Sequence, residues 1–169
     1  MREVHQKIVN EIVEEYKKDK STLAITLFGS LARGEEREDS DVDIEIISED
    51  AKKWELKQDD ERYRIKIDLV ICPKKHLLHQ VEKYPYLCHD YLSEKIIYDP
   101  KGFMKDLKEK LKGYFDKHPE VVEFWEKKLK IMKENKAKGK DPKDAIKSYD
   151  EAEILFSDEH KVTRDFFRE

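Results

Sequence analysis

Two kinds of hydrophobic pattern alternate along residues 1–100. Apolar side chains recur every three to four positions in residues 1–20, which predicts an amphipathic helix. Short β-branched apolar runs predict strands at residues 22–28, 42–48 and 95–98. A further helix is expected from Pro73, with an interruption at Pro85. Strands that alternate with helices predict an α/β fold, with a mixed sheet packed by helices.

The region between the second strand and Pro73 has the pattern of a hairpin. We expect a short strand at residues 53–57, a polar turn at residues 58–61 and a returning strand at residues 63–71. The returning strand carries Asp68 inside an otherwise apolar run. A carboxylate buried in a strand is costly unless it meets a cation or hydrogen-bond donors.

From Lys101 onward the apolar positions follow only the helical period. Three helices are predicted around residues 103–114, 121–132 and 145–156. Breaks are expected at residues 117–119 and 135–142, where proline or glycine can end one helix and open the next. Three apolar residues near the end of the chain could extend the last helix: Val162, Phe166 and Phe167.

Charge is abundant and unevenly distributed. Charged residues make up 44% of the 169 residues and the net charge is −4. Residues 35–61 hold thirteen Asp or Glu against four Lys or Arg, a local net of −9. Residues 101–140 hold thirteen Lys against seven acids, a net of +6. The acidic segment would repel a phosphate without a divalent ion, whereas the basic segment could attract a polyanion or form a solvated helix face.

The composition also limits the cellular setting. No apolar run approaches ~18 residues, so no membrane span is expected. The N-terminus lacks a signal-peptide pattern, and we expect a cytoplasmic protein. Cys72 and Cys88 are expected to be small core residues rather than a disulfide.

The segment from residue 27 to residue 47 holds the candidate chemistry. Gly29-Ser30 ends the first strand and opens a short helix, so backbone N–H groups there can face an anion. Asp41 and Asp43 open the second strand at i, i+2 spacing, which puts both carboxylates on one face. Each feature alone is also compatible with an ordinary turn or a polar strand start. Their conjunction with Asp68 favours a metal and nucleotide site.

These residues resemble the signature of the DNA polymerase β nucleotidyltransferase superfamily, and its minimal and aminoglycoside-type members above all. The resemblance rests on Gly29-Ser30-x-Ala32-Arg33-Gly34, on Ser40-Asp41-x-Asp43 and on the later in-strand Asp68. It implies a nucleotidyltransferase domain at residues 1–100, followed by a helical C-terminal region at residues 101–169 that could complete an acceptor pocket or a homodimer.

The resemblance also implies residue roles. Asp41 and Asp43 would hold Mg²⁺ or Mn²⁺, and Asp68 would ligate a second ion or take the proton from the acceptor hydroxyl. Gly29 and Ser30 would bind the β and γ phosphates. Arg33 would either contact the triphosphate or pair with nearby acids.

The implied reaction moves a nucleoside monophosphate from an NTP, with ATP as the expected donor, to a hydroxyl of a protein, RNA or small molecule. No motif identifies the acceptor. Two alternatives keep the fold and act by binding. One is an antitoxin-like module that docks to a helical toxin, and the other is an RNA-binding module that uses the basic helices.

Overall fold

A five-stranded sheet carries the candidate residues, and its strand order is β3-β4-β2-β1-β5. The computed structural model describes residues 1–139 and 143–157, without the side chains of residues 143–146. The strands are β1 (Thr22–Leu27), β2 (Val42–Ser48), β3 (Glu55–Arg62), β4 (Ile65–Pro73) and β5 (Lys95–Tyr98). β2 and β4 run parallel and the other neighbours run antiparallel, so the predicted mixed sheet is confirmed.

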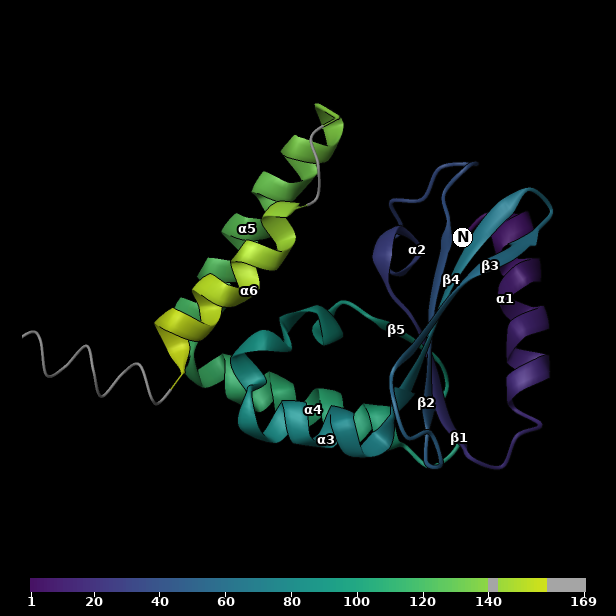
Figure 1. The fold of residues 1–169 in the computed structure, drawn as a ribbon, viewed down its shortest axis with the longest axis horizontal. Coiled ribbons are helices and arrows are strands. Elements are labelled where there is room, and N and C mark those ends of the chain that lie inside the picture. Colours follow the sequence, from purple (N-terminus) through teal and green to yellow (C-terminus); the bar gives the residue numbers. More distant parts are fainter. Residues whose placement is uncertain (140–142, 158–169) are drawn as a thin grey trace, which may run out of the picture. The chain divides into compact units, whose positions relative to one another are not determined.

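Helices make up much of the rest of the described chain (Figure 1). They are α1 (Glu3–Tyr16), α2 (Gly29–Arg33), α3 (Lys74–Lys83), α4 (Phe103–Lys117), α5 (Pro119–Ala137) and α6 (Lys143–Phe156). Two short 3₁₀ segments, η1 (Pro85–Leu87) and η2 (His89–Leu92), follow the interruption expected at Pro85. No helix of the described residues is long and apolar enough to cross a membrane.

The chain forms two compact units. The first comprises residues 1–79 and 90–110, and the second comprises residues 80–89 and the described residues from 111 onward. The division into domains at residue 100 stays a prediction.

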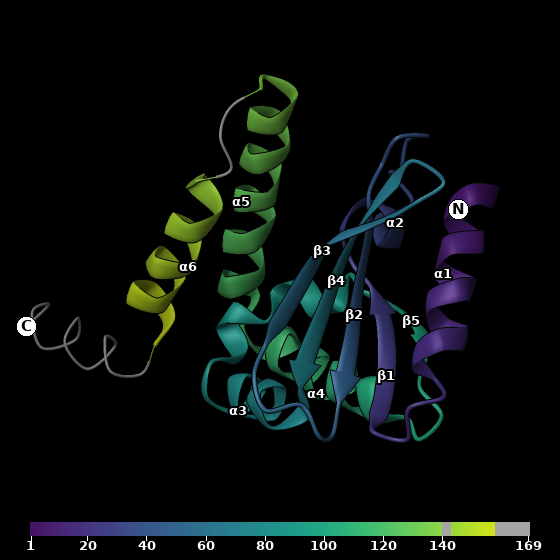
Figure 2. The same cartoon turned by 45° about the vertical axis from the view of Figure 1, so that its right-hand side comes forward.

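The core of the first unit lies between α1 and one face of the sheet. In Figures 1 and 2, α1 runs along that face. Its buried Ile8, Val9 and Ile12 pack with apolar residues of three strands. Those strand residues are Ile25, Leu27, Val42, Ile44, Ile46, Ile65, Ile67 and Leu69. Because side chains alternate along a strand, Asp43 lies on the opposite face, as predicted from the sequence.

The hairpin differs from the prediction in the position of its turn. β3 continues through residues 58–61, and the turn is formed by Tyr63 and Arg64, whose φ angles are 54° and 66°. Positive φ at both central residues is the geometry of a two-residue hairpin loop. The polar run was wrongly assigned to a turn because β3 is an exposed edge strand, visible at the side of the sheet in Figure 2. Such a strand needs no alternation of apolar residues.

The second unit is helical and has aromatic packing of its own. α5 and α6 lie side by side, and Phe124 meets Phe156 at a ring-centroid distance of 5.4 Å. The buried Trp125 donates a hydrogen bond from Nε1 to the Tyr86 carbonyl at 2.7 Å. The three predicted C-terminal helices are confirmed, and so is the predicted break between α4 and α5, directly before Pro119. The expected contribution of Val162, Phe166 and Phe167 lies outside the described residues, as do residues 140–142 of the expected break.

Candidate active site

The three aspartates come together through the register of two parallel strands. Asp43 of β2 pairs directly with Asp68 of β4. Asp41 lies one residue before β2, on the same face as Asp43. Continuing the register by two positions places Asp41 opposite Lys66, which lies two residues before Asp68. Three carboxylates and one ammonium therefore occupy four neighbouring positions on one face of the sheet.

Gly29 provides the space into which the Asp43 carboxylate fits. It begins α2 with φ +65°, a conformation that favours glycine. A Cβ atom at this position would lie 2.0 Å from Asp43 Oδ2 and 2.9 Å from its Cγ. The backbone N–H of Phe28 also donates to the Asp43 carbonyl at 3.1 Å. The Gly-Ser turn and the second aspartate of the motif are thus in direct contact.

Asp68 is held by two neighbours that the sequence analysis did not single out. Lys66 Nζ lies 3.0 Å from Asp68 Oδ1, and Gln58 Nε2 donates to the same oxygen at 3.1 Å. The hydrogen bond to Asp68, with the charges of Asp68, Asp41 and Asp43, raises the pKa of Lys66. Lys66 therefore stays an ammonium and lies in the field of all three carboxylates.

The aspartates do not form a closed metal cage in this conformation. Among the described residues, no group of three or more His, Cys, Asp or Glu side chains is arranged to hold a metal ion. The Asp43 carboxylate lies against Gly29, and Asp68 Oδ1 is occupied by Lys66 and Gln58. A cation that bound Asp68 through Oδ1 would have to displace these two partners. The assignment of the three aspartates as ligands stays a prediction.

The loop before Asp41 is attached to α1 by a buried histidine. His5 has no exposed surface, and its Nε2 lies 2.9 Å from the Ser40 carbonyl oxygen. A carbonyl only accepts, so Nε2 carries the proton and donates. His5 Nδ1 is buried with no hydrogen-bond partner among the described residues. Ser40 Oγ accepts from the Arg37 backbone N–H at 2.8 Å, which completes the support of this loop.

The remaining residues of the motif lie on or beside α2. Ser30 is half-buried, and its carbonyl accepts from the Glu35 N–H at 3.0 Å. Arg33 Nε donates to Glu35 Oε2 at 2.9 Å. Arg33 therefore pairs with a nearby acid here, and its predicted contact with the triphosphate stays a prediction.

Further along the same face of β2 lies a buried pair of acids. Glu45 follows Asp43 by two residues and is buried, and burial together with the Glu94 charge raises its pKa. Burial raises the pKa of Glu94 to about 7, against the opposing effects of the Thr26 hydrogen bond and the Lys108 charge. Thr26 Oγ1 donates to Glu94 Oε2 at 2.7 Å. The pair retains a proton near neutral pH because two carboxylates cannot both ionise in a dry site.

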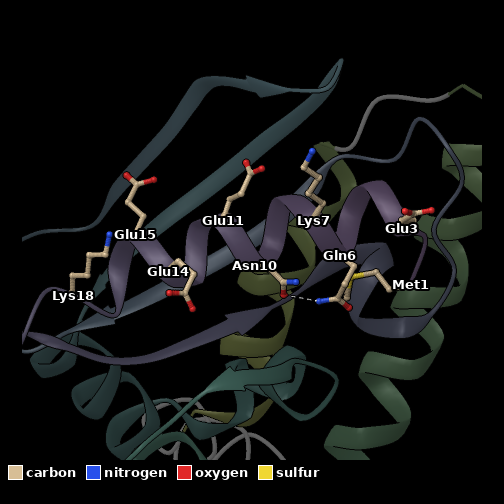
Figure 3. A pocket seen from close by; sticks show the side chains of 9 residues that line it. All are labelled: Met1, Glu3, Gln6, Lys7, Asn10, Glu11, Glu14, Glu15 and Lys18. Atoms are coloured by element: carbon tan, nitrogen blue, oxygen red, sulfur yellow. Dashed lines mark hydrogen bonds between the residues drawn. The ribbon is translucent and has the colours of Figure 1, made fainter.

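A separate hollow lies on the outer side of α1 and contains none of the candidate residues. Its volume is about 1030 Å³, and all nine lining residues fall between Met1 and Lys18 (Figure 3). α1 covers the sheet face opposite Asp43. This hollow is therefore not part of the carboxylate site.

The residues fit a divalent cation by their chemistry. Carboxylate oxygens are the protein ligands that Mg²⁺ prefers. Three carboxylates lie on one face of the sheet, in β4, in β2 and directly before β2. The space over Gly29, which a Cβ would fill, lets the Asp43 carboxylate approach the backbone of the Gly-Ser turn.

Comparison with known proteins supports this interpretation of the fold. Residues 6–98 match the nucleotidyltransferase domain family. Two proteins of Methanocaldococcus jannaschii, each named "Putative protein adenylyltransferase", are similar to this chain. One is 36% identical over an alignment of 91 residues, and the match covers 44% of this chain and 92% of the relative. The other is 29% identical over an alignment of 143 residues, and the match covers 75% of this chain and 96% of the relative.

A solved structure shares the fold. It is a nucleotidyltransferase-like protein from Exiguobacterium sibiricum 255-15, with a TM-score of 0.52 and 19% sequence identity. The similarity covers 63% of this chain and 38% of that chain, so this chain spans well under half of the larger protein. The family match includes the Gly-Ser turn and all three aspartates. The chain therefore belongs to the nucleotidyltransferase domain family.

Proposed function

We propose that this protein transfers AMP from ATP to a hydroxyl group of a protein, with Mg²⁺ or Mn²⁺ held by Asp41, Asp43 and Asp68. The observation that carries the proposal is the pairing of Asp43 with Asp68 beside Gly29. The names of the two archaeal relatives support a protein as acceptor and ATP as donor.

The proposed reaction is a displacement at the α-phosphate. The acceptor oxygen forms a bond to the α-phosphorus, the bond to the β-phosphate oxygen breaks, and pyrophosphate leaves. Asp41, Asp43 and Asp68 would hold the metal ion, which would supply positive charge to neutralise the phosphates. The hydroxyl proton passes to Asp68 or to solvent, and transfer to Asp68 requires the hydroxyl oxygen to lie about 3 Å away.

The remaining motif residues position the nucleotide in this proposal. The backbone N–H groups and hydroxyl at Gly29-Ser30 bind the β and γ phosphates. Arg33 exchanges Glu35 for a phosphate oxygen, because a guanidinium binds either anion with charge-assisted hydrogen bonds. His5 holds the loop that carries Asp41.

The test is to incubate the protein with each α-labelled NTP and either Mg²⁺ or Mn²⁺. The label is then sought in pools of protein, RNA and small molecules. We expect label on protein, from ATP, and none after EDTA or in Asp43→Asn. Label on RNA or on a small molecule would replace the proposed acceptor. Absence of label from every pool, together with tight binding to a partner protein or to RNA, would favour one of the binding-module alternatives.

A further inference from the structure

Lys66 is placed where the site needs a positive charge when no metal is bound. It lies on the same face of β4 as Asp68 and opposite Asp41 in the parallel register. Its ammonium contacts Asp68 Oδ1 at 3.0 Å. The register of two paired strands places the backbone of Lys66 beside these carboxylates.

This ion pair differs from the most exposed ion pairs of the described residues. The side chain of Asp68 is 21% exposed and that of Lys66 is 47% exposed. In the pair between Lys127 and Glu123, by contrast, both side chains are about 70% exposed. Lys66 also lies on the same face of the sheet as Asp43 and, by the continued register, opposite Asp41. An exposed pair of single charges contributes little, whereas a cation beside the half-buried Asp43 and Asp68 and the exposed Asp41 relieves their mutual repulsion.

We propose that Lys66 is a built-in counter-ion of the carboxylate site, which a divalent cation must displace from Asp68 in order to bind. The proposal rests on the proposed function in one respect, namely that Asp41, Asp43 and Asp68 are the metal ligands. Lys66 is a positioning residue, because in the metal-free protein it acts through Asp68.

The displacement has a consequence for the order of binding. The ammonium competes with a free divalent ion for Asp68 Oδ1 and repels it, so Lys66 weakens the affinity for metal alone. A metal that arrives with a nucleotide brings phosphate oxygens, and these also attract the released ammonium. Lys66 therefore favours entry of the metal–nucleotide complex over entry of the bare ion.

The experiment measures Mn²⁺ binding without nucleotide, by electron paramagnetic resonance of free Mn²⁺ at low salt. Lys66→Met removes the charge and keeps an unbranched side chain. We expect this variant to bind Mn²⁺ about tenfold more tightly than the wild type. Lys66→Gln, which keeps a hydrogen-bond donor to Asp68, should show the same gain. Lys66→Arg should bind Mn²⁺ as the wild type does.

A matched control separates this local effect from the change in net charge. Lys17 forms an ion pair with Glu14 on α1, and its side chain is 39% exposed. β1 begins just after this end of α1, at Thr22, which pairs with Ser48 at the end of β2 remote from Asp41. Lys17→Met changes the net charge by the same amount and should leave Mn²⁺ binding unchanged.

A second readout needs no metal. In EDTA, Lys66→Met should lower the melting temperature by about 2 °C because the carboxylates lose their counter-ion. Adding Asp68→Asn to this variant should restore the melting temperature, because the repulsion is then reduced.

Mn²⁺ affinity in Lys66→Met that equals or falls below that of the wild type would overturn the proposal. Transfer of AMP is scored separately in the wild-type protein. Tighter Mn²⁺ binding in Lys66→Met without any transfer by the wild type would support the counter-ion and refute the proposed function. Transfer by the wild type with unchanged Mn²⁺ affinity in Lys66→Met would support the proposed function and refute the counter-ion role of Lys66.

Discussion

Substitution of Gly29 by alanine tests the contact between the Gly-Ser turn and Asp43. The chain offers a matched control at Gly34, at the other end of α2. Both glycines have positive φ angles, +65° at Gly29 and +68° at Gly34. A Cβ at Gly34 would meet nothing within 4 Å, whereas a Cβ at Gly29 would lie 2.0 Å from Asp43 Oδ2. The two variants therefore share the backbone strain and differ in the steric contact.

The backbone strain determines the expected loss of stability, and the steric contact determines the expected loss of AMP transfer. A left-handed conformation costs a non-glycine residue roughly 1–2 kcal/mol, so Gly34→Ala should lose about this much free energy of unfolding and Gly29→Ala at least as much. Ordinary contact with a Cβ begins near 3.4 Å, so the Asp43 carboxylate must move by more than 1 Å in Gly29→Ala. A misplacement of about 1 Å at a reacting centre can reduce the rate about 10²-fold. Gly29→Ala should lose AMP transfer on this scale, and Gly34→Ala should keep most of it.

Urea denaturation and transfer assays on both variants decide the matter, with Mn²⁺ binding as a third measurement. Weakened Mn²⁺ binding in Gly29→Ala alone would connect the loss of activity to Asp43. Equal transfer by the two variants would refute the reasoning, because the contact with Asp43 would then have no role in the site.

Two further predictions concern buried groups that support the site. The pKa of Glu94 is raised to about 7 from an ordinary 4.5, so the folded protein binds this proton more tightly than the unfolded chain. Glu94 should therefore reduce the free energy of unfolding as the pH rises from about 4.5 through 7, by on the order of 3 kcal/mol. Urea denaturation at pH 5 and pH 8 should show this loss in the wild type relative to Glu94→Gln, and identical pH dependence of the two proteins would contradict it. His5→Gln keeps a donor at the position of Nε2, whereas His5→Asn is too short to reach the Ser40 carbonyl. His5→Asn should lose roughly 1–3 kcal/mol of free energy of unfolding and should bind Mn²⁺ more weakly. His5→Gln should lose less stability and less Mn²⁺ affinity. Equal losses in the two variants would show that packing, rather than the hydrogen bond, is what His5 contributes.

The parts of the fold that depend on local pattern could be predicted from the sequence. β2 and β5 were predicted at their observed bounds, because β-branched apolar runs end sharply at polar or proline residues. The i, i+2 spacing also placed Asp41 and Asp43 on the face away from the core. The turn at residues 63–64 was missed because nothing apolar marks an exposed edge strand.

Features that depend on contacts between distant residues were not found in the sequence. Lys66 could have been noticed from its i−2 spacing to Asp68, but its relation to Asp41 requires the parallel register of β2 and β4. The hydrogen bond from His5 to Ser40 joins a helix to a loop, and no local pattern signals it. The proximity of Glu45 and Glu94 likewise arises only when the sheet forms.

The central claim is that Asp41, Asp43 and Asp68 bind a nucleotide through a divalent metal. Calorimetric titration of ATP into the wild-type protein, with Mg²⁺ and then with EDTA, tests this claim most directly. Without a cation, a triphosphate would meet three carboxylates and one lysine in a partly dry site, so we expect binding with Mg²⁺ and none measurable with EDTA. Equal affinity for ATP under both conditions would contradict the account.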